Sequence, residues 1–302
     1  MTACPSLRSL DLDQNRLQHI SGLDCLHNLD MLSLRKQDLH ASSQTSLATS
    51  IFQQTLHCRS LHLSYNAISS LQLPHAYHSI QHLELTSCGL AEIPSDFGLR
   101  FPNLHYLNLN FNAIKDPRPL LNITRLEHLY LAGNRIARLR KSVATLAKLS
   151  CLGVLDVRDN PFTHGFYAPL SATGTTASSV STGIQTVTLK GSRQQRRRSA
   201  SRDADRQQTA RREACSLPSA DAVRDAEHLA RLDEETRLRR RVYELLLANS
   251  CKGLKELDGL KFRRERAMVR DSVFERLVKL GIVRRSEQGG HAEVRAVEMV
   301  TE

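Results

Sequence analysis

The sequence contains no tryptophan, and aromatic residues make up only 5% of its 302 residues. No apolar run approaches the roughly 20 residues that a membrane-spanning helix needs, and the first ten residues, MTACPSLRSL, do not form a secretory signal peptide. The seven cysteines show no C-x-x-C pair and no regular spacing. We therefore expect a cytosolic or nuclear protein whose cysteines are buried structural thiols in a reducing compartment.

The residue sets that carry catalysis are also missing. We find no glycine-rich phosphate loop, no supported pair of catalytic carboxylates, and no Ser-His-Asp or Cys-His arrangement, so we expect neither an enzyme nor a cofactor. His62 and His82 could lie on adjacent strands, but a metal site needs three or four converging ligands with an outer shell. Because no third strong ligand is evident, we expect no metal site.

Leucine is abundant, and its spacing repeats. Between residues 104 and 139, the pattern L-x-x-L-x-L-x-x-N-x-L begins at Leu104 and recurs without a mismatch 22 residues later at Leu126. Further copies begin at residues 7, 29, 58, 80 and 152. This spacing is typical of leucine-rich repeats of the short class, with about 22 residues each.

The fold class that follows is an α/β leucine-rich-repeat solenoid, or horseshoe. The x-L-x-L-x segments predict short parallel strands on the concave face, with alternate leucines pointing inward. Short helices or turns should form the convex face, including a helix within residues 43–56. The asparagine at each strand's end should turn inward and bond backbone groups that would otherwise be buried without partners. Gln37 and Cys88 replace it in two repeats.

We divide the chain into four parts. Residues 1–167 hold repeats one to seven, and residues 168–217 form an insertion rich in Ser, Thr and Arg that we expect to be disordered. Residues 218–285 hold a helix over 219–250, a terminal repeat at Leu254 and Leu257, and a capping helix over 264–280 that ends at Gly281. We expect Val269, Val273, Phe274 and Leu277 to cover the leucine columns. Residues 286–302 should be a flexible tail.

The repeat ladder begins six residues after Met1, with no N-terminal cap before it. Its first strand would therefore be a bare sheet edge. We expect either that a partner covers this edge or that the chain is the C-terminal part of something longer.

The positions between the leucines face the concave surface. On the middle four repeats they gather aromatic residues with polar handles, a composition typical of protein-binding surfaces. The alternative is a scatter of tolerated surface residues. The candidate protein-binding residues are His62, Tyr65, His82, Tyr106, Phe111, His128 and Tyr130.

Basic charge lies away from this surface. The net charge is +11, of which residues 1–170 carry +3 and residues 171–302 carry +8. The concave positions of the first seven repeats hold five acidic and three basic residues, whereas a phosphate-binding surface should be basic. We therefore expect no nucleic-acid binding by the repeats, although the basic insertion leaves an RNA-binding alternative open.

The insertion contains candidate phosphorylation sites. Arginines precede Ser199, Ser201 and Thr209, as in targets of basophilic kinases, and phosphate there would cancel positive charge. A solvated linker and a nuclear-localisation patch are alternatives for the same segment.

The stretch from Arg239 to Val283 resembles the terminal module of one fungal family, the leucine-rich-repeat scaffolds of the spindle pole body in the septation initiation (mitotic exit) network. The opening CPSLRSLDLDQNRL looks like the first repeat of the same family. The resemblance is carried by Tyr243, Leu245, Leu246, Cys251, Leu254, Leu257, Asp258, Gly259, Asp271, Val273, Leu277 and Gly281.

This resemblance implies a non-catalytic scaffold in the cytoplasm and cytoskeleton, at the microtubule-organising centre. By resemblance, its partners are a spindle pole anchor protein, a small GTPase module and kinases that control cytokinesis, with no membrane binding. Family members carry much of their kinase docking on a long N-terminal arm that this chain lacks. A generic repeat adaptor, such as a protein phosphatase regulatory subunit, is the alternative function.

Overall fold

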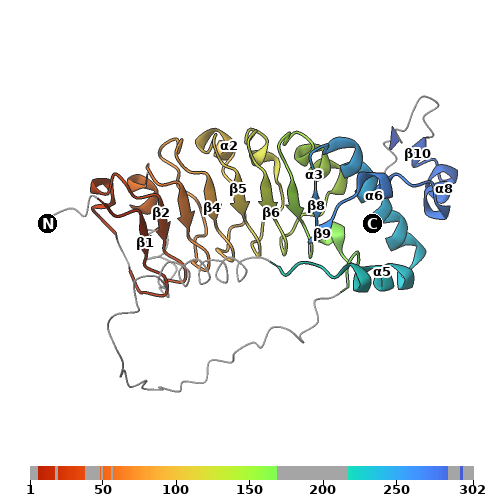
Figure 1. Cartoon of the computed structure of the whole chain (residues 1–302), viewed down its shortest axis with the longest axis horizontal. Coiled ribbons are helices and arrows are strands. Elements are labelled where there is room, and N and C mark those ends of the chain that lie inside the picture. Colours follow the sequence, from red (N-terminus) through yellow and green to blue (C-terminus); the bar gives the residue numbers. More distant parts are fainter. Residues whose placement is uncertain are drawn as a thin grey trace, which may run out of the picture.

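A computed structural model shows a curved solenoid with the N-terminal repeats at one end and helices gathered at the other (Figure 1). The structure describes residues 6–17, 20–37, 48, 50–55, 57–168, 217–284 and 293–294. The candidate phosphorylation sites and almost all of the insertion lie outside these residues.

Nine short strands of the described chain form one sheet in sequence order. β1 to β8 pair in parallel, and β9 returns antiparallel to β8. Each strand pairs with the strand of the next repeat through equivalent residues. The central leucines therefore align, as Leu83, Leu107 and Leu129 do. This register confirms the predicted leucine-rich-repeat fold. The strands are β1 (Ser9–Asp11), β2 (Met31–Ser33), β3 (Ser60–His62), β4 (His82–Glu84), β5 (Tyr106–Asn108), β6 (His128–Tyr130), β7 (Val154–Asp156), β8 (Glu256–Leu257) and β9 (Leu260–Lys261).

The convex side consists of short helical turns. These are the 3-10 turns η1 (Leu23–Cys25), η2 (Arg118–Leu120) and η3 (Pro161–Thr163), and the helices α2 (Phe97–Arg100) and α3 (Leu139–Leu146). Residues 50–54 are also helical, within the expected segment 43–56. Three aromatic rings, Phe52, Tyr77 and Phe101, are fully buried on this side, with Tyr77 and Phe101 stacked at 5.0 Å. These rings therefore form part of the main core beneath the convex side.

Buried amides join successive repeats. The side-chain Nδ2 of Asn112 donates to the carbonyls of Leu85 at 2.8 Å and Leu109 at 2.9 Å. Its Oδ1 accepts from the amides of Cys88 and Leu90, each at 3.0 Å. Asn66, Asn134 and Asn160 make equivalent bonds. Each asparagine therefore satisfies backbone groups on two turns at once.

The two substitutes keep part of this role. Gln37 donates from Nε2 to the carbonyl of Leu12 at 2.8 Å and accepts from the amide of Leu17 at 3.2 Å. The thiol of Cys88 donates to the carbonyl of Leu63 at 3.4 Å. A thiol offers one weak donor where the amide offers two strong ones. The repeat that carries Cys88 therefore has fewer and weaker hydrogen bonds at this position.

The expected single helix over 219–250 is wrong, because the chain forms two helices, α5 (Ala222–Arg231) and α6 (Glu234–Ser250). Asp233 separates them, and its carboxylate accepts from the amide of Thr236 at 2.8 Å. Such N-cap bonds favour a helix start over a continuous helix. Where we expected one helix over 264–280, the chain also forms two, α7 (Arg264–Ala267) and α8 (Ser272–Lys279). The carboxylate of Asp271 caps α8 by accepting from the amide of Phe274.

The expectation that the last helix covers the leucine columns is also wrong. Tyr243 and Leu247 of α6, with Cys251 directly after the helix, belong to the main core and close its end. Phe274 and Leu277 of α8 instead pack with Leu238, Val242 and Leu245, on another face of α6, while Val269 is 51% exposed. A hairpin of β10 (Val283–Arg284) and β11 (Glu293–Val294) follows. The C-terminal cap therefore has two layers.

Asp258 occupies the ladder position of the terminal repeat. Its Oδ1 accepts from the amide of Val157 at 2.8 Å, and its Oδ2 accepts from the hydroxyls of Tyr243 and Tyr167. The carboxyl group is fully buried. Burial, together with the charge of nearby Asp156, raises its pKa from 3.8 to about 7, against the opposing effect of these hydrogen bonds. One acidic side chain thus joins the seventh repeat, the chain after it, and the closing helix.

The cysteine expectation is partly wrong. Cys58, Cys88 and Cys251 are buried free thiols, and burial raises the pKa of Cys58 and Cys251 to about 11. Cys25 and Cys151 are exposed, because both lie at convex turns rather than on core positions. Cys4 and Cys215 lie outside the described residues. None of the described helices combines the length and apolarity that crossing a membrane would require.

Replacing Asn112 with alanine should leave the carbonyl of Leu85 and the amides of Cys88 and Leu90 without their partners, whereas the carbonyl of Leu109 keeps its bond from Asn134. We expect the free energy of unfolding to fall by about 3 kcal/mol, since each buried polar group left without a partner costs roughly 1–3 kcal/mol. Urea denaturation followed by circular dichroism measures this loss. Asn122→Ala, at an exposed position, is the control, and an equal effect of both substitutions would contradict the ladder role.

Asp258 should make stability depend on pH. Since its pKa is raised from 3.8 to about 7 in the folded protein, the stability that it contributes is complete below pH 4 and is lost as pH rises through 7. The loss should approach roughly 1 kcal/mol per pH unit between these limits. Asp258→Asn should flatten the melting temperature between pH 4 and 7, whereas Asp24→Asn on the exposed turn η1 should not. An unchanged slope in Asp258→Asn would refute this account.

Candidate concave protein-binding surface

The sheet register determines which side chains share the concave face. Side chains of the first and third residues of each strand point to this face, because alternate residues point to opposite sides. The register aligns the first positions as a row, Met31, Ser60, His82, Tyr106, His128, Val154 and Glu256. The third positions form a second row, Asp11, Ser33, His62, Glu84, Asn108, Tyr130 and Asp156.

Four of the candidate residues form a continuous group, which we call the aromatic strip: His82, Tyr106, His128 and Tyr130. The rings of His82 and Tyr106 stack with 3.9 Å between centroids and 7° between planes. Tyr106 also lies 5.3 Å from Tyr130 and 5.9 Å from His128. All four are half-buried. The structure therefore brings these predicted residues together across three adjacent strands.

Tyr65 and Phe111 lie apart from this strip, at the C-terminal ends of their strands. Both have positive φ, 64° and 56°, and both are 41% exposed. Phe111 lies over Gly133 of the next repeat, where an added Cβ would come within 2.5 Å of the phenyl ring. The two rings therefore extend the concave surface at one margin, and glycine at position 133 makes room for one of them.

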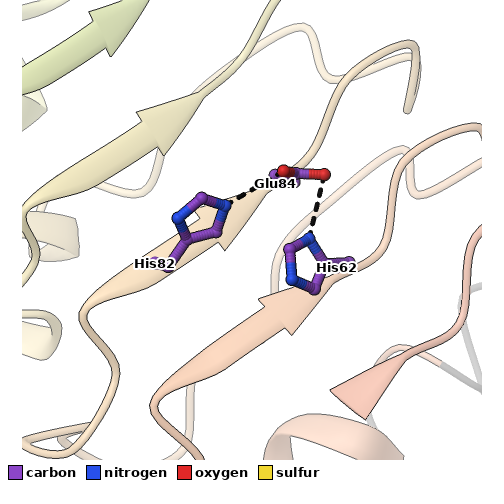
Figure 2. Close-up of side chains that lie close together, drawn as sticks. All are labelled: His62, His82 and Glu84. Atoms are coloured by element: carbon purple, nitrogen blue, oxygen red, sulfur yellow. Dashed lines mark hydrogen bonds and ion pairs between the residues drawn. The ribbon is translucent and has the colours of Figure 1, made fainter. Parts of the chain in front are cut away.

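His62 does not belong to the accessible surface, contrary to the expectation. It is only 2% exposed, and its Nδ1 lies 3.0 Å from the carboxylate of Glu84. His82 bonds the other oxygen of Glu84 through Nε2, also at 3.0 Å. Figure 2 shows both imidazoles turned toward this single carboxylate. His62 is therefore held inward by its contact with Glu84 and not presented to a partner.

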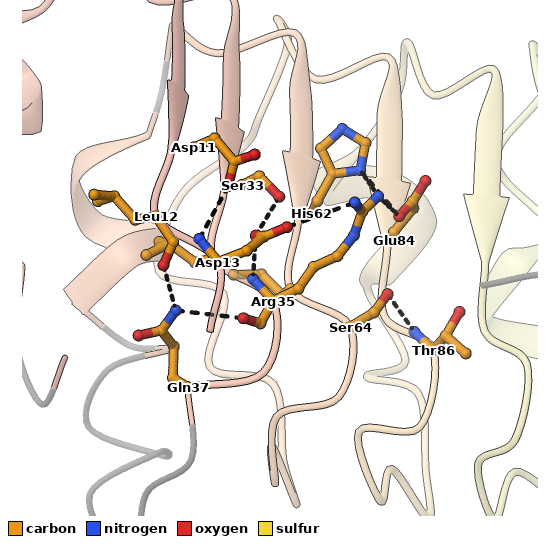
Figure 3. Close-up of polar contacts among 12 residues, drawn as sticks. Asp11, Leu12, Asp13, Ser33, Arg35, Gln37, His62, Ser64, Glu84 and Thr86 are labelled. Atoms are coloured by element: carbon orange, nitrogen blue, oxygen red, sulfur yellow. Dashed lines mark hydrogen bonds and ion pairs between the residues drawn. The ribbon is translucent and has the colours of Figure 1, made fainter. Parts of the chain in front are cut away.

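Arg35 supplies the positive charge that the buried carboxylate needs. Its guanidinium contacts Glu84 and lies 2.9 Å from Nδ1 of His62 (Figure 3). It also lies 3.8 Å from Asp13. Burial alone would raise the pKa of Glu84, but hydrogen bonds with His62 and His82 and the charge of Arg35 hold it well below its usual range. Glu84 is therefore a charged, fully buried hub.

The expectation that no third metal ligand is nearby is wrong. Within the described residues, His62, His82 and Glu84 each offer one ligand atom, and these atoms lie within 4.8 Å of one another. However, the Arg35 guanidinium already lies against both His62 and Glu84. The Nε2 of His62 is also buried without a partner, whereas metal-bound imidazoles donate to an outer shell. These contacts favour an ion-pair network, and the absence of a metal stays a prediction.

Sequence reasoning missed the roles of Glu84 and Arg35. One signal was present, because His82 and Glu84 alternate on one strand and must share a face. The role of Arg35 could not be found that way, because it lies two strands from Glu84 and only its long side chain spans the distance.

A second buried ion pair lies beyond the other end of the strip. Arg158 contacts Asp156 through Nη2 at 2.6 Å and Nε at 3.0 Å, and donates to the carbonyl of Pro218 at 2.9 Å. Because two of the three concave cations are thus paired internally, the face has no excess of positive charge for a phosphate backbone.

Removing Arg35 should leave Glu84 buried without its cation. We expect Arg35→Met to lower the free energy of unfolding by roughly 3–5 kcal/mol, and a further Glu84→Gln substitution to restore much of that loss. Chemical denaturation of the two variants measures both effects.

Arg59→Met is the matched control, since Arg59 pairs with Asp30 at 3.5 Å but is 66% exposed. Such a surface pair should contribute less than about 1 kcal/mol. If the double variant is no more stable than Arg35→Met, the network does not depend on charge neutralisation.

Comparison with known proteins identifies the repeats and a larger relative. A family model for leucine-rich repeats, in two copies, matches residues 102–142. The septation initiation network scaffold protein cdc11 of Schizosaccharomyces pombe is 31% identical over 255 residues, which cover 84% of this chain and 22% of that scaffold. The chain therefore spans about a fifth of the length of this relative.

The chain is also similar to two other proteins, over a smaller part of its length. Lumican of Oryctolagus cuniculus is 29% identical over 136 residues, covering 43% of this chain and 67% of lumican. Among solved structures, internalin C2 of Listeria monocytogenes has a TM-score of 0.38 and 22% identity, over 51% of this chain and 72% of that chain. The similarity to cdc11 therefore confirms the resemblance to the septation initiation network scaffolds, and the family model together with the strand register confirms the leucine-rich-repeat fold.

Proposed function

We propose that this chain is a non-catalytic protein-binding scaffold at the spindle pole body, which helps to recruit the components that control septation and mitotic exit. The observation that carries the proposal is the aromatic strip. Its four rings form one contiguous, half-buried patch on the inner face of the solenoid.

The strip has the physical properties of a binding hot spot. Tyrosine combines a large apolar area with a polar tip and loses little side-chain entropy on binding. The stacked rings restrict one another, and His82 is further held by its bond to Glu84. A partner would therefore meet an ordered surface, which lowers the entropic cost of association.

The similarity to cdc11 supports the cellular setting. That protein is a septation initiation network scaffold, and from the resemblance we propose that this chain works at the spindle pole with an anchor protein, a small GTPase module and kinases. Since the chain spans 22% of that relative, we assign to it the repeat platform and its anchoring contacts. Neither a phosphatase-regulator function nor RNA binding is favoured by a contact among the described residues.

The double substitution Tyr106→Ala/Tyr130→Ala should weaken partner capture at least tenfold while the repeats stay folded. Both rings are half-buried on the surface rather than part of the leucine core, so their loss should remove binding area more than stability. Pull-down of the anchor component and imaging of a tagged copy in dividing cells measure the effect.

Leu99→Ala is the matched control, because Leu99 on α2 is 65% exposed and lies on the convex side. Full recruitment by the double variant would exclude the aromatic strip as the binding site. Signal at the spindle pole that needs neither tyrosine would do the same.

A further inference from the structure

The aromatic strip borders an acidic side chain on the last parallel strand. The register aligns His128 on β6 with Val154 on β7, and Val154 with Glu256 on β8. Because neighbouring strands lie roughly 4.8 Å apart, Glu256 is about 10 Å from the His128 position. A partner side chain that lies over Val154 would thus meet aromatic rings on one side and a carboxylate on the other.

Glu256 differs from the other acidic groups of this region. Asp156 is buried and paired with Arg158, whereas Glu256 is half-buried and has no ion-pair partner in the part of the chain that the structure describes. Lys261 lies opposite Glu256 on β9, but its side chain is exposed and no ion pair joins the two. Glu256 is therefore a partly desolvated charge that an external cation could neutralise.

The charge of Glu256 acts on the strip itself. Burial is the main reason that the pKa of Tyr130 rises to about 12, and the negative charges of Glu256 and Asp156 raise it further. The carboxylate of Glu256 is therefore close enough to Tyr130 to act on its hydroxyl, and it would stabilise a cation placed between the two. The carboxylate of Glu256 and the ring of Tyr130 can therefore act on the same bound group.

Building on the proposed scaffold function, we propose that Tyr130 and Glu256 bind an arginine side chain of the protein partner. A guanidinium is planar, stacks on aromatic faces and pairs with a carboxylate through a fork of donors. A lysine ammonium group could pair with the carboxylate, but it has no planar group to stack on the tyrosine ring. An acidic or phosphorylated segment would be repelled from this end of the face.

The methyl groups of Val154 offer a reporter at the centre of this site. In the full chain labelled at valine methyls, titration with the peptide acetyl-Gly-Arg-Gly-amide should shift the Val154 resonances in a saturable way. The same peptide with citrulline, which keeps the shape of arginine without its charge, should bind at least fivefold more weakly. Raising the salt concentration should weaken the arginine response only.

Variants separate charge from stacking. Glu256→Gln and Tyr130→Ala should each weaken the arginine response at least fivefold, whereas Tyr130→Phe should preserve it. Glu92→Gln, an exposed acid outside the concave face, should have no effect. Equal binding of the citrulline peptide, or unchanged binding by Glu256→Gln, would overturn the arginine assignment.

These outcomes can be distinguished from failure of the proposed function. If Tyr106→Ala/Tyr130→Ala still captures the partner, the concave binding site itself is refuted. If that variant loses its partner while Val154 responds equally to arginine and citrulline, the binding site stands and the arginine assignment fails.

Discussion

The structure depends on the buried amide that ends most of its strands. A solenoid of three-residue strands cannot satisfy its own inner backbone, because each turn leaves carbonyls and amides facing a core of leucine side chains. One asparagine, such as Asn112, bonds groups on two turns and so ties each repeat to the one before it. At the last repeat a carboxyl group, Asp258, takes this position and also accepts from two tyrosines of the closing segments. The same device therefore both propagates the ladder and ends it.

This rigid ladder allows charges to be buried next to the aromatic strip. Arg35 with Glu84 on one side, and Arg158 with Asp156 on the other, form internally neutral pairs at the two ends of the strip. Burying an ion pair is costly unless the hydrogen bonds around it are well placed. Here the strand register fixes those bonds, so the pairs can hold neighbouring rings in position. Beside the aromatic strip, Glu256 remains as a half-buried carboxylate with no ion-pair partner among the described residues.

The sequence predicted those features that depend on local periodicity. The leucine spacing identified the eight parallel strands β1 to β8 and their register, and the alternation of positions found the four rings of the aromatic strip. Two features escaped it for physical reasons. The helix breaks at Asp233 and Asp271 come from single capping bonds that helix propensity alone does not reveal. The burial of His62 depends on a carboxylate of the next repeat and a guanidinium of the previous one, which no single repeat encodes.

The contact between Phe111 and Gly133 limits how freely these repeats could be exchanged. Leucine-rich repeats share one core pattern, so each would fit equally well anywhere in the stack if the core alone mattered. Yet the exposed phenyl ring of the fifth repeat occupies the space that any side chain at position 133 of the sixth would need. Moving or duplicating the fifth or the sixth repeat would therefore change the shape of the concave surface and leave the leucine core intact. The order of the repeats, and not only their number, defines the shape that a partner meets.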